Sequence, residues 1–246
     1  MFEFMLKNVE KMSINYSPNF YPKKRSISKV KYLIFHYTGM KSEIGAIKKL
    51  TDKNSKVSCH YFIKKNGEII NMVPDLYIAW HAGISYWKKD KFLNSKSIGV
   101  EISNPGHEYG YKEFNKKQIK SIIILSKKLK KKYKIKNNNI LGHSDIAPLR
   151  KKDPGEKFPW KLFYKNKLSI WHNLSERNCK ELRKIKLDNN ISFYKLLFKF
   201  GYKYTNNPSD KIKILKNFQR RFRPELISSI VDKECDAILK SLIYLN

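Results

Sequence analysis

Long hydrophobic runs are absent from this sequence of 246 residues. The longest candidate, Leu76–Trp87, is well short of the ~20 residues that a membrane-spanning helix needs, and it contains His81 and Gly83. We therefore expect no transmembrane segment. Charged residues interrupt the first twelve positions, Met1–Met12, and no cysteine lies there to accept a lipid. The sequence thus predicts neither a secretory signal nor a lipid anchor at this end.

Cysteine is also scarce. Cys59, Cys179 and Cys235 are the three cysteines, widely spaced and odd in number. They form no CxxC pair, which argues against a disulfide framework. A reducing compartment is compatible with this pattern but is not required by it.

Acidic residues are few beside basic ones, 21 against 52, which gives a formal net charge of +31. The basic residues are 45 lysines and 7 arginines. Proteins that grip nucleic acid usually enrich arginine, because its planar fork matches phosphates and guanine. We therefore interpret the charge first as a compositional bias toward Lys, Ile and Asn, and expect no nucleic-acid partner. Attraction to an anionic polymer, either nucleic acid or an acidic cell-wall glycan, is the alternative.

Hydrophobic residues make up 41 % of the chain, which is enough for a buried core and excludes wholesale disorder. Val30–Thr38 is a nearly continuous apolar run typical of a central strand, and Asn66-Gly67 indicates a hairpin between strands 60–65 and 68–73. Ser97–Ser103 alternates, which puts Glu101 on the face opposite Ile98, Val100 and Ile102.

Helical periodicity follows over 113–133, with a shorter helix expected over 42–50 and a strand over 139–143. Strands that alternate with amphipathic helices predict an α/β fold with a mixed central β-sheet flanked by helices. We expect this domain to span residues 1–165, including an amino-terminal extension. A connector rich in Lys and Asn should cover 166–190, and a small three-helix domain 191–246, with helices over 192–200, 209–222 and 232–245.

Five polar residues lie at strand ends or in the stiff loop SDIAPLRKKDPGEKFPW: His36, Glu101, His143, Lys151 and Asp153. Two histidines and a carboxylate can serve as three zinc ligands and leave a fourth position for water. Periodicity alone leaves another interpretation open. A histidine at a strand end is more often a hydrogen-bonded structural residue, an aspartate before proline a turn residue, and a lysine in a basic run solvated. Glu101 is more informative, because a carboxylate on a hydrophobic strand needs a compensating partner.

The order of several motifs adds a family resemblance. The stretches are SPNFYP at 17–22, IFHYTGM at 34–40, VSCHYFIKKNGEI at 57–69, AWHAG at 79–83, SIGVEISNPGHEYGY at 97–111 and GHSDIAPLRKKDPGEKFPW at 142–160. Together they resemble the N-acetylmuramoyl-L-alanine amidases of the AmpD and AmiD type, relatives of the peptidoglycan recognition proteins. The ending FGYKY…FQRRFRPE…VDKECDAIL resembles the three-helix peptidoglycan-binding domain that follows some of these enzymes.

The resemblance implies roles for the five polar residues. His36, His143 and Asp153 would hold one Zn²⁺ per chain. Glu101 matches the catalytic carboxylate of the family, and Lys151 matches the lysine that stabilises the transition state.

The resemblance also implies a substrate cleft lined by Trp80, His81 and Asn104, although packing in the core is an equal alternative for Trp80. The implied activity is zinc-dependent hydrolysis of the amide bond between N-acetylmuramic acid and L-alanine in bacterial peptidoglycan or muropeptides. Two alternatives are a non-catalytic peptidoglycan sensor and a zinc peptidase that cuts within the stem peptide. The absence of a signal favours cytoplasmic recycling, whereas the wall-binding tail favours the cell envelope, so the sequence does not choose a compartment.

Overall fold

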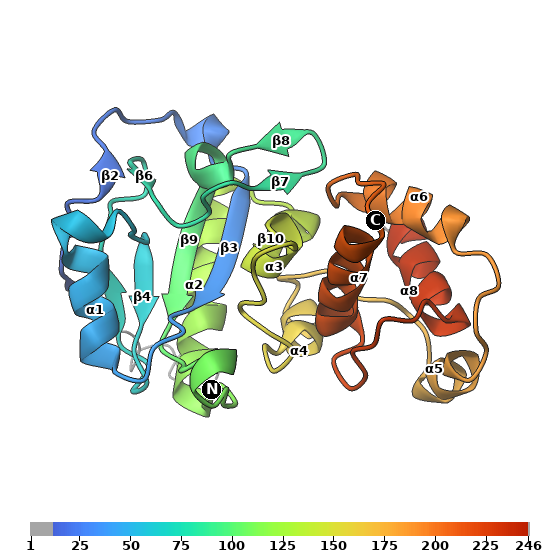
Figure 1. The fold of residues 1–246 in the computed structure, drawn as a ribbon. Helices are drawn as coiled ribbons and strands as arrows, with labels where there is room; N and C mark the ends of the chain where they lie inside the picture. Colours follow the sequence, from blue (N-terminus) through green and yellow to red (C-terminus); the bar gives the residue numbers. More distant parts are fainter. Residues whose placement is uncertain (1–11, 246) are drawn as a thin grey trace. The chain divides into compact units, whose positions relative to one another are not determined.

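The computed structural model describes residues 12–245 (Figure 1). The prediction of no signal concerns Met1–Met12, of which only Met12 lies inside the described residues. The described chain divides into two compact units, each made of two segments: residues 12–81 with 94–134, and residues 82–93 with 135–245. This division follows packing, and it groups residues 135–165 with the carboxyl-terminal helices. The domain boundaries expected from the sequence pattern stay a prediction.

The first unit is built on the mixed β-sheet. Its strands follow the order β1 (Met12–Ile14), β5 (Ile69–Asn71), β4 (Tyr61–Ile63), β9 (Ser97–Ile102) and β3 (Tyr32–Tyr37). β3, β9 and β4 run parallel to one another, whereas β4 and β5 form the antiparallel hairpin expected around Asn66-Gly67. β2 (Phe20–Tyr21) and β6 (Ile78–Ala79) form a separate antiparallel pair. The predicted mixed sheet is therefore confirmed.

Two helices flank this sheet. α1 (Glu43–Thr51) begins at its Ser42 cap and packs Ala46 and Leu50 against Phe62 and Ile70 of the sheet. α2 (Lys116–Tyr133) lies behind the strands in the view of Figure 1 and buries one apolar stripe, as its periodicity predicts. The buried members of that stripe are Ile122, Leu125, Leu129 and Tyr133. Short 3-10 helices occur at η2 (Ile27–Lys29), η3 (Lys53–Ser55), η4 (Leu93–Lys96), η5 (His107–Tyr109) and η6 (Asn137–Asn139).

The second unit contains short strands and the carboxyl-terminal helices. Its elements are β7 (Tyr86–Trp87), β8 (Asp90–Lys91), β10 (Ile140–Gly142), α3 (His143–Ile146), α4 (Trp160–Lys165), α5 (Glu176–Arg183), α6 (Ile191–Phe200), α7 (Pro208–Phe222) and α8 (Lys233–Tyr244). The last three helices agree with the predicted ones within two residues. The β7–β8 hairpin packs on them, because Trp87 contacts the rings of Phe200 and Tyr202 and the Lys88 amide donates to the Gly201 carbonyl at 2.8 Å.

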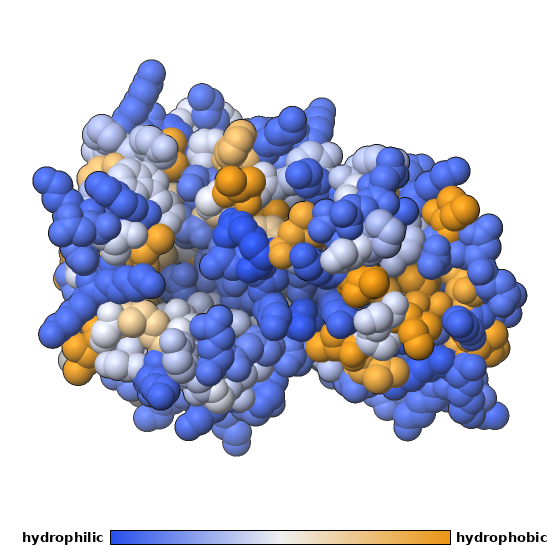
Figure 2. Space-filling model, viewed as in Figure 1, coloured by the Kyte–Doolittle hydropathy of each residue, from blue (hydrophilic) through white to orange (hydrophobic). Residues whose placement is uncertain are grey.

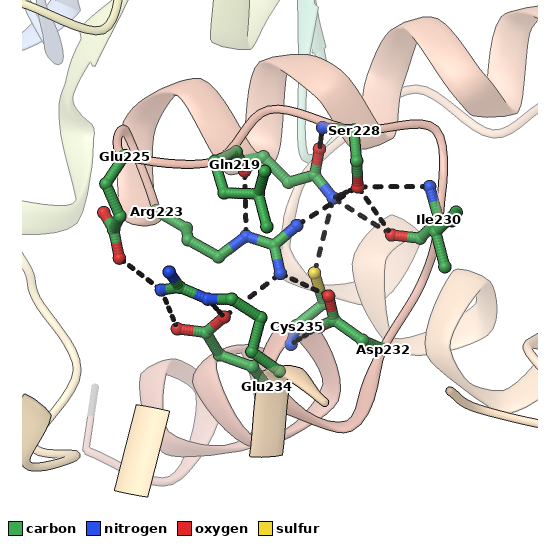
Figure 3. Close-up of polar contacts among 10 residues, drawn as sticks. Gln219, Arg223, Glu225, Ser228, Ile230, Asp232, Glu234 and Cys235 are labelled. Carbon is green, nitrogen blue, oxygen red and sulfur yellow. Dashed lines mark hydrogen bonds and ion pairs between the residues drawn. The ribbon is translucent and has the colours of Figure 1, made fainter. Parts of the chain in front are cut away.

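Helix α5 lies in the segment that the sequence predicts to be a connector. Only Cys179 of this helix is buried, so the helix has no apolar stripe that periodicity could detect. Ion pairs hold it instead: Arg183 binds Glu234 of α8 at 2.6 Å and Glu225 at 2.5 Å. Figure 3 shows Glu234 within a wider network with Arg223 and Asp232. Charge pairs rather than hydrophobic burial therefore place this helix.

Candidate active site

His36 and Glu101 lie side by side on the first unit's sheet. β3 and β9 are parallel, and their register pairs His36 with Glu101 one residue before each strand ends. Residues paired in register point to the same face of a sheet. The carboxyl ends of parallel strands are where α/β sheets usually carry their sites. The position predicted for Glu101, on the face opposite its strand's apolar residues, thus places it beside His36.

His81 is the hydrogen-bonding partner of His36. Its Nδ1 lies 3.0 Å from His36 Nε2, and its Nε2 lies 3.1 Å from Ser97 Oγ. Gly99 makes room for this ring, because a Cβ at that position would lie 2.3 Å from His81 Cγ. His81 is 9 % exposed. The structure therefore gives His81 a role in orienting His36, and its predicted contact with substrate stays a prediction.

A third histidine in this region, His60, is structural. The backbone amide of Gly99 donates to its Nδ1 at 3.0 Å, which requires the neutral ring. Burial, reinforced by the nearby Arg25 guanidinium, lowers the pKa of His60 to about 3. Its ring packs edge-on against His81, with centroids 5.6 Å apart. His60 thus buttresses the histidine that orients His36.

The second unit carries His143 and Asp153 on the loop that follows β10. His143 Nδ1 lies 3.0 Å from Asp153 Oδ2, and both residues are buried. The loop closes through the Ser144 amide, which donates to the Asp153 carbonyl at 2.8 Å. Gly142 permits the close return, because a Cβ there would lie 2.6 Å from the Pro154 ring. The folding back of this loop, expected from its prolines and glycine, is confirmed.

His36, His143 and Asp153 each offer a ligand atom, and these atoms all lie within 4.8 Å of one another. The three residues are buried. Two imidazole nitrogens and one carboxylate oxygen form a donor set that suits zinc with an open fourth position. The buried contact of an imidazole nitrogen with a carboxylate at 3.0 Å is what a shared cation would stabilise. The residues present therefore fit the metal that the sequence predicts.

Lys151 is half-buried in the same loop, two residues before Asp153. Its amide donates to the Ala147 carbonyl at 3.0 Å, and its own carbonyl accepts from Asn217 of α7 at 3.1 Å. The neighbouring Arg150 donates to the carbonyl oxygens of Ala82 and, at 2.9 Å, Ile84. Burial lowers the pKa of Arg150. The backbone at Lys151 is thus held from two directions.

Sequence reasoning missed Asp145, which lies in this loop, and Asn217 and Arg221, which bind to it. Asp145 is buried and forms an ion pair with the buried Arg221. One signal could have drawn attention to Arg221. Three of the seven arginines fall within four residues, at 220, 221 and 223, in a chain that otherwise prefers lysine.

The other predicted cleft residues have structural contacts. Asn104 is buried, and its side chain donates to the Lys112 carbonyl at 2.7 Å and accepts from the Gly106 amide at 3.0 Å, so it holds the turn at 104–112. Trp80 is half-buried and packs edge-on against Tyr21. Its indole Nε1 is buried and has no hydrogen-bond acceptor within the described part of the chain. Substrate contacts of Trp80 and Asn104 stay a prediction.

Comparison with known proteins identifies the family. Residues 26–156, just over half of the chain, match the Amidase_2 family of N-acetylmuramoyl-L-alanine amidases. The chain belongs to this family. It is 34 % identical to the N-acetylmuramoyl-L-alanine amidase AmiD of Escherichia coli, an alignment that covers 87 % of this chain and 83 % of AmiD. The prediction of an amidase of the AmpD and AmiD type is confirmed.

Solved structures of two amidases also resemble this chain. The complex of Escherichia coli AmiD with the substrate anhydro-N-acetylmuramic acid-L-Ala-D-gamma-Glu-L-Lys superposes with a TM-score of 0.79 at 31 % identity, over 92 % of this chain and 93 % of AmiD. AmpDh3 from Pseudomonas aeruginosa, in complex with an anhydromuramic pentapeptide, gives 0.79 at 29 % identity over 91 % and 94 %. These relatives are bacterial. Within residues 12–245, no helix has the length and apolar character needed to cross a membrane.

Proposed function

We propose that the chain hydrolyses the amide bond between N-acetylmuramic acid and L-alanine, in muropeptides or peptidoglycan, with one Zn²⁺ held by His36, His143 and Asp153. The convergence of these three buried ligand atoms within 4.8 Å carries the proposal. Family membership supports it, as do the anhydromuramyl peptides bound by the two similar amidases.

Zn²⁺ at this position would lower the pKa of a water molecule from 15.7 toward ~7 and polarise a carbonyl group. The chain's own residues supply the remaining steps. Glu101 takes the proton of the attacking water and passes it to the nitrogen of L-alanine as the amide C–N bond breaks. The ammonium of Lys151 stabilises the negative charge on the lactyl carbonyl oxygen, and a single preorganised donor of this kind can contribute ~2.7–4 kcal/mol. The products are the muramic acid carboxylate and a peptide with a free L-alanine amine.

The buried partners of the site explain how it keeps its shape. His36 is oriented by the hydrogen bond to His81, which is itself bonded to Ser97. The His143 ring is held on its other side, because its Nε2 lies 3.2 Å from the Ala82 carbonyl and 3.3 Å from Arg150 Nη2, while its Nδ1 faces Asp153. Such outer partners fix ring orientation and usually raise metal affinity.

The test is a comparison of the wild type with Glu101→Gln on two substrates, intact peptidoglycan and anhydro-muropeptides, with products identified by mass spectrometry. Zinc content is measured on the same samples. We expect the wild type to release peptides that begin with a free L-alanine amine, and Glu101→Gln to keep its zinc but lose turnover. Glu181→Gln, an exposed carboxylate on α5, is the matched control and should remain fully active.

The same assay separates the alternatives. Cleavage inside the stem peptide would identify a zinc peptidase, and glycan binding without cleavage a recognition protein; either result contradicts the proposal. A preference for intact peptidoglycan would support work in the envelope and a glycan-binding role for residues 191–246, whereas a preference for anhydro-muropeptides would support recycling.

A further inference from the structure

Helix α7 holds the loop that carries His143, Lys151 and Asp153. Asn217 of this helix is 2 % exposed, and its Nδ2 donates to the Pro148 carbonyl at 2.8 Å and to the Lys151 carbonyl at 3.1 Å. One side chain thus bridges two points of the loop, the second of them at the residue assigned to the oxyanion.

The orientation of this amide is set by its neighbour. Arg220 donates to Asn217 Oδ1 at 2.5 Å and binds Glu156 at 3.0 Å. Because the guanidinium can only donate, Oδ1 must face it and Nδ2 must face the two loop carbonyls. Glu156 lies three residues after Asp153, so α7 contacts the loop both before and after that proposed ligand.

A second contact fixes the start of the loop. Asp145 accepts from the Gly142 amide at 2.7 Å and from Tyr202 Oη at 3.0 Å, and its charge is met by Arg221 of α7. Arg221 also donates to the Ile140 carbonyl at 3.0 Å. These bonds enclose His143 between a fixed strand end and a fixed first turn of α3.

We infer that α7 is a positioning element of the amidase site, in which Asn217 and Arg221 set the backbone that presents His143, Lys151 and Asp153. The carboxyl-terminal helices then support the metal site, in addition to the wall-binding role that the resemblance implies for them. This inference rests on the proposed function for the roles of those three residues. It agrees with the packing, since residues 135–165 and the carboxyl-terminal helices form one compact unit.

The test uses the full-length chain and measures zinc affinity by competition with a chromophoric chelator. The variant is Asn217→Ala, and the matched control is Gln219→Ala. Gln219 lies on the same helix and is equally buried, and its amide also spans two points of a loop, the Ser228 amide and the Ile230 carbonyl (Figure 3). That loop carries no proposed ligand.

We expect Asn217→Ala to bind zinc about tenfold more weakly than the wild type, the low end of the loss seen when a direct partner of a metal ligand is removed, because Asn217 holds the loop backbone and not a ligand side chain. The zinc affinity of Gln219→Ala should stay within about twofold of the wild type, because the loop that Gln219 holds carries no proposed ligand. At saturating zinc, kcat of Asn217→Ala should fall while KM is nearly unchanged, because Lys151 is displaced. The absorption spectrum of the Co²⁺-loaded variant should shift for Asn217→Ala alone.

Two further variants keep the test decisive if Asn217→Ala does not fold. Asn217→Asp preserves the acceptor for Arg220 but loses the donor, so it should weaken zinc binding. Arg221→Lys keeps the charge but loses one of the two directed hydrogen bonds, so it should recover only part of the affinity that Arg221→Met loses. Equal zinc affinity in the Asn217 and Gln219 variants would overturn the inference. A wild type that binds zinc tightly but cleaves no muropeptide would refute the proposed function instead, and would leave the zinc comparison valid.

Discussion

The buried ion pair between Arg221 and Asp145 should be a large single contribution to the stability of the second unit. Both side chains are at most 2 % exposed, so neither charge can be solvated by water if its partner is removed. Arg221→Met is the informative change, because methionine fills much of the same volume while it removes the charge. Among residues 12–245, Asp145 would then keep the Gly142 amide and Tyr202 as its donors, and it would remain a buried carboxylate without a cation.

The expected loss follows from these surroundings. Removal of one partner of a buried pair costs about 3–5 kcal/mol, because it leaves an uncompensated charge. The guanidinium also lies 4.4 Å from the centre of the Trp160 ring, a cation–π contact worth about 1–2 kcal/mol when buried. These terms overlap, so we expect a total near 4 kcal/mol. For a chain of this size, 1 kcal/mol shifts the Tm by about 2–4 °C, which predicts a decrease of roughly 10 °C.

Urea unfolding followed by tryptophan fluorescence is the suitable assay, since Trp160 lies under the guanidinium. The matched control is Lys161→Ala, which breaks an exposed pair with Glu176 in the same unit and should cost at most about 1 kcal/mol. The double variant Asp145→Asn, Arg221→Met should recover a large part of the lost free energy of unfolding, because it no longer contains the unpaired Asp145 carboxylate. The reasoning fails if Arg221→Met and Lys161→Ala are destabilised equally.

Three further predictions concern the first unit and the metal. Gly99→Ala should fold but lose at least about tenfold in kcat/KM, because its methyl group would displace His81 from His36; full activity would show that this contact is dispensable. Because the unfolded state takes up a proton on His60 near pH 6.5 and the folded state only near pH 3, stability should fall with decreasing pH in that window, by about 1.4 kcal/mol per unit. Urea midpoints at pH 7 and 5 should therefore differ more for the wild type than for His60→Gln, and parallel changes would contradict the assignment. Treatment with a chelator should abolish hydrolysis and added Zn²⁺ should restore it, with the circular dichroism spectrum unchanged; activity that survives complete zinc removal would refute the metal proposal.

Much of the fold could be predicted because its elements carry local signals. The buried run at 30–38 contains β3, the alternating segment contains β9, and Asn66-Gly67 closes the β4–β5 hairpin. The capping box at Asn115 and one apolar stripe define α2. In each case the residues that determine the element lie inside it or next to it.

The proposed metal ligands could be predicted from the sequence, but the residues that hold their loop in place could not. His36, His143 and Asp153 could be named because their motifs stand in family order, and the bent loop that joins the last two carries proline and glycine. Asn217 could not be named, and the arginine cluster at 220–223 marks Arg221 without identifying its partners, because those partners lie 66–81 residues away and no local pattern links a helix to a distant loop. Helix α5 was not predicted either, because it is held by ion pairs with residues that are distant in the sequence.

The way the chain uses its two basic residue types bears on the meaning of its charge. Arg25, Arg221 and Arg223 are each at most 5 % exposed and donate to carbonyl or carboxylate oxygens inside their unit. Arginine is thus used where several directed hydrogen bonds are needed. Hydrophilic side chains cover most of the molecular face shown in Figure 2, and lysine is the commonest charged residue of the chain. Of the arginines within the described residues, Arg150 and Arg177 are the two exposed ones, so the charged surface is mainly lysine. A surface that binds nucleic acid usually favours arginine, and this distribution therefore favours a compositional origin for the +31 charge. On that argument, replacing exposed lysines far from residue 151 should leave hydrolysis of small muropeptides unchanged.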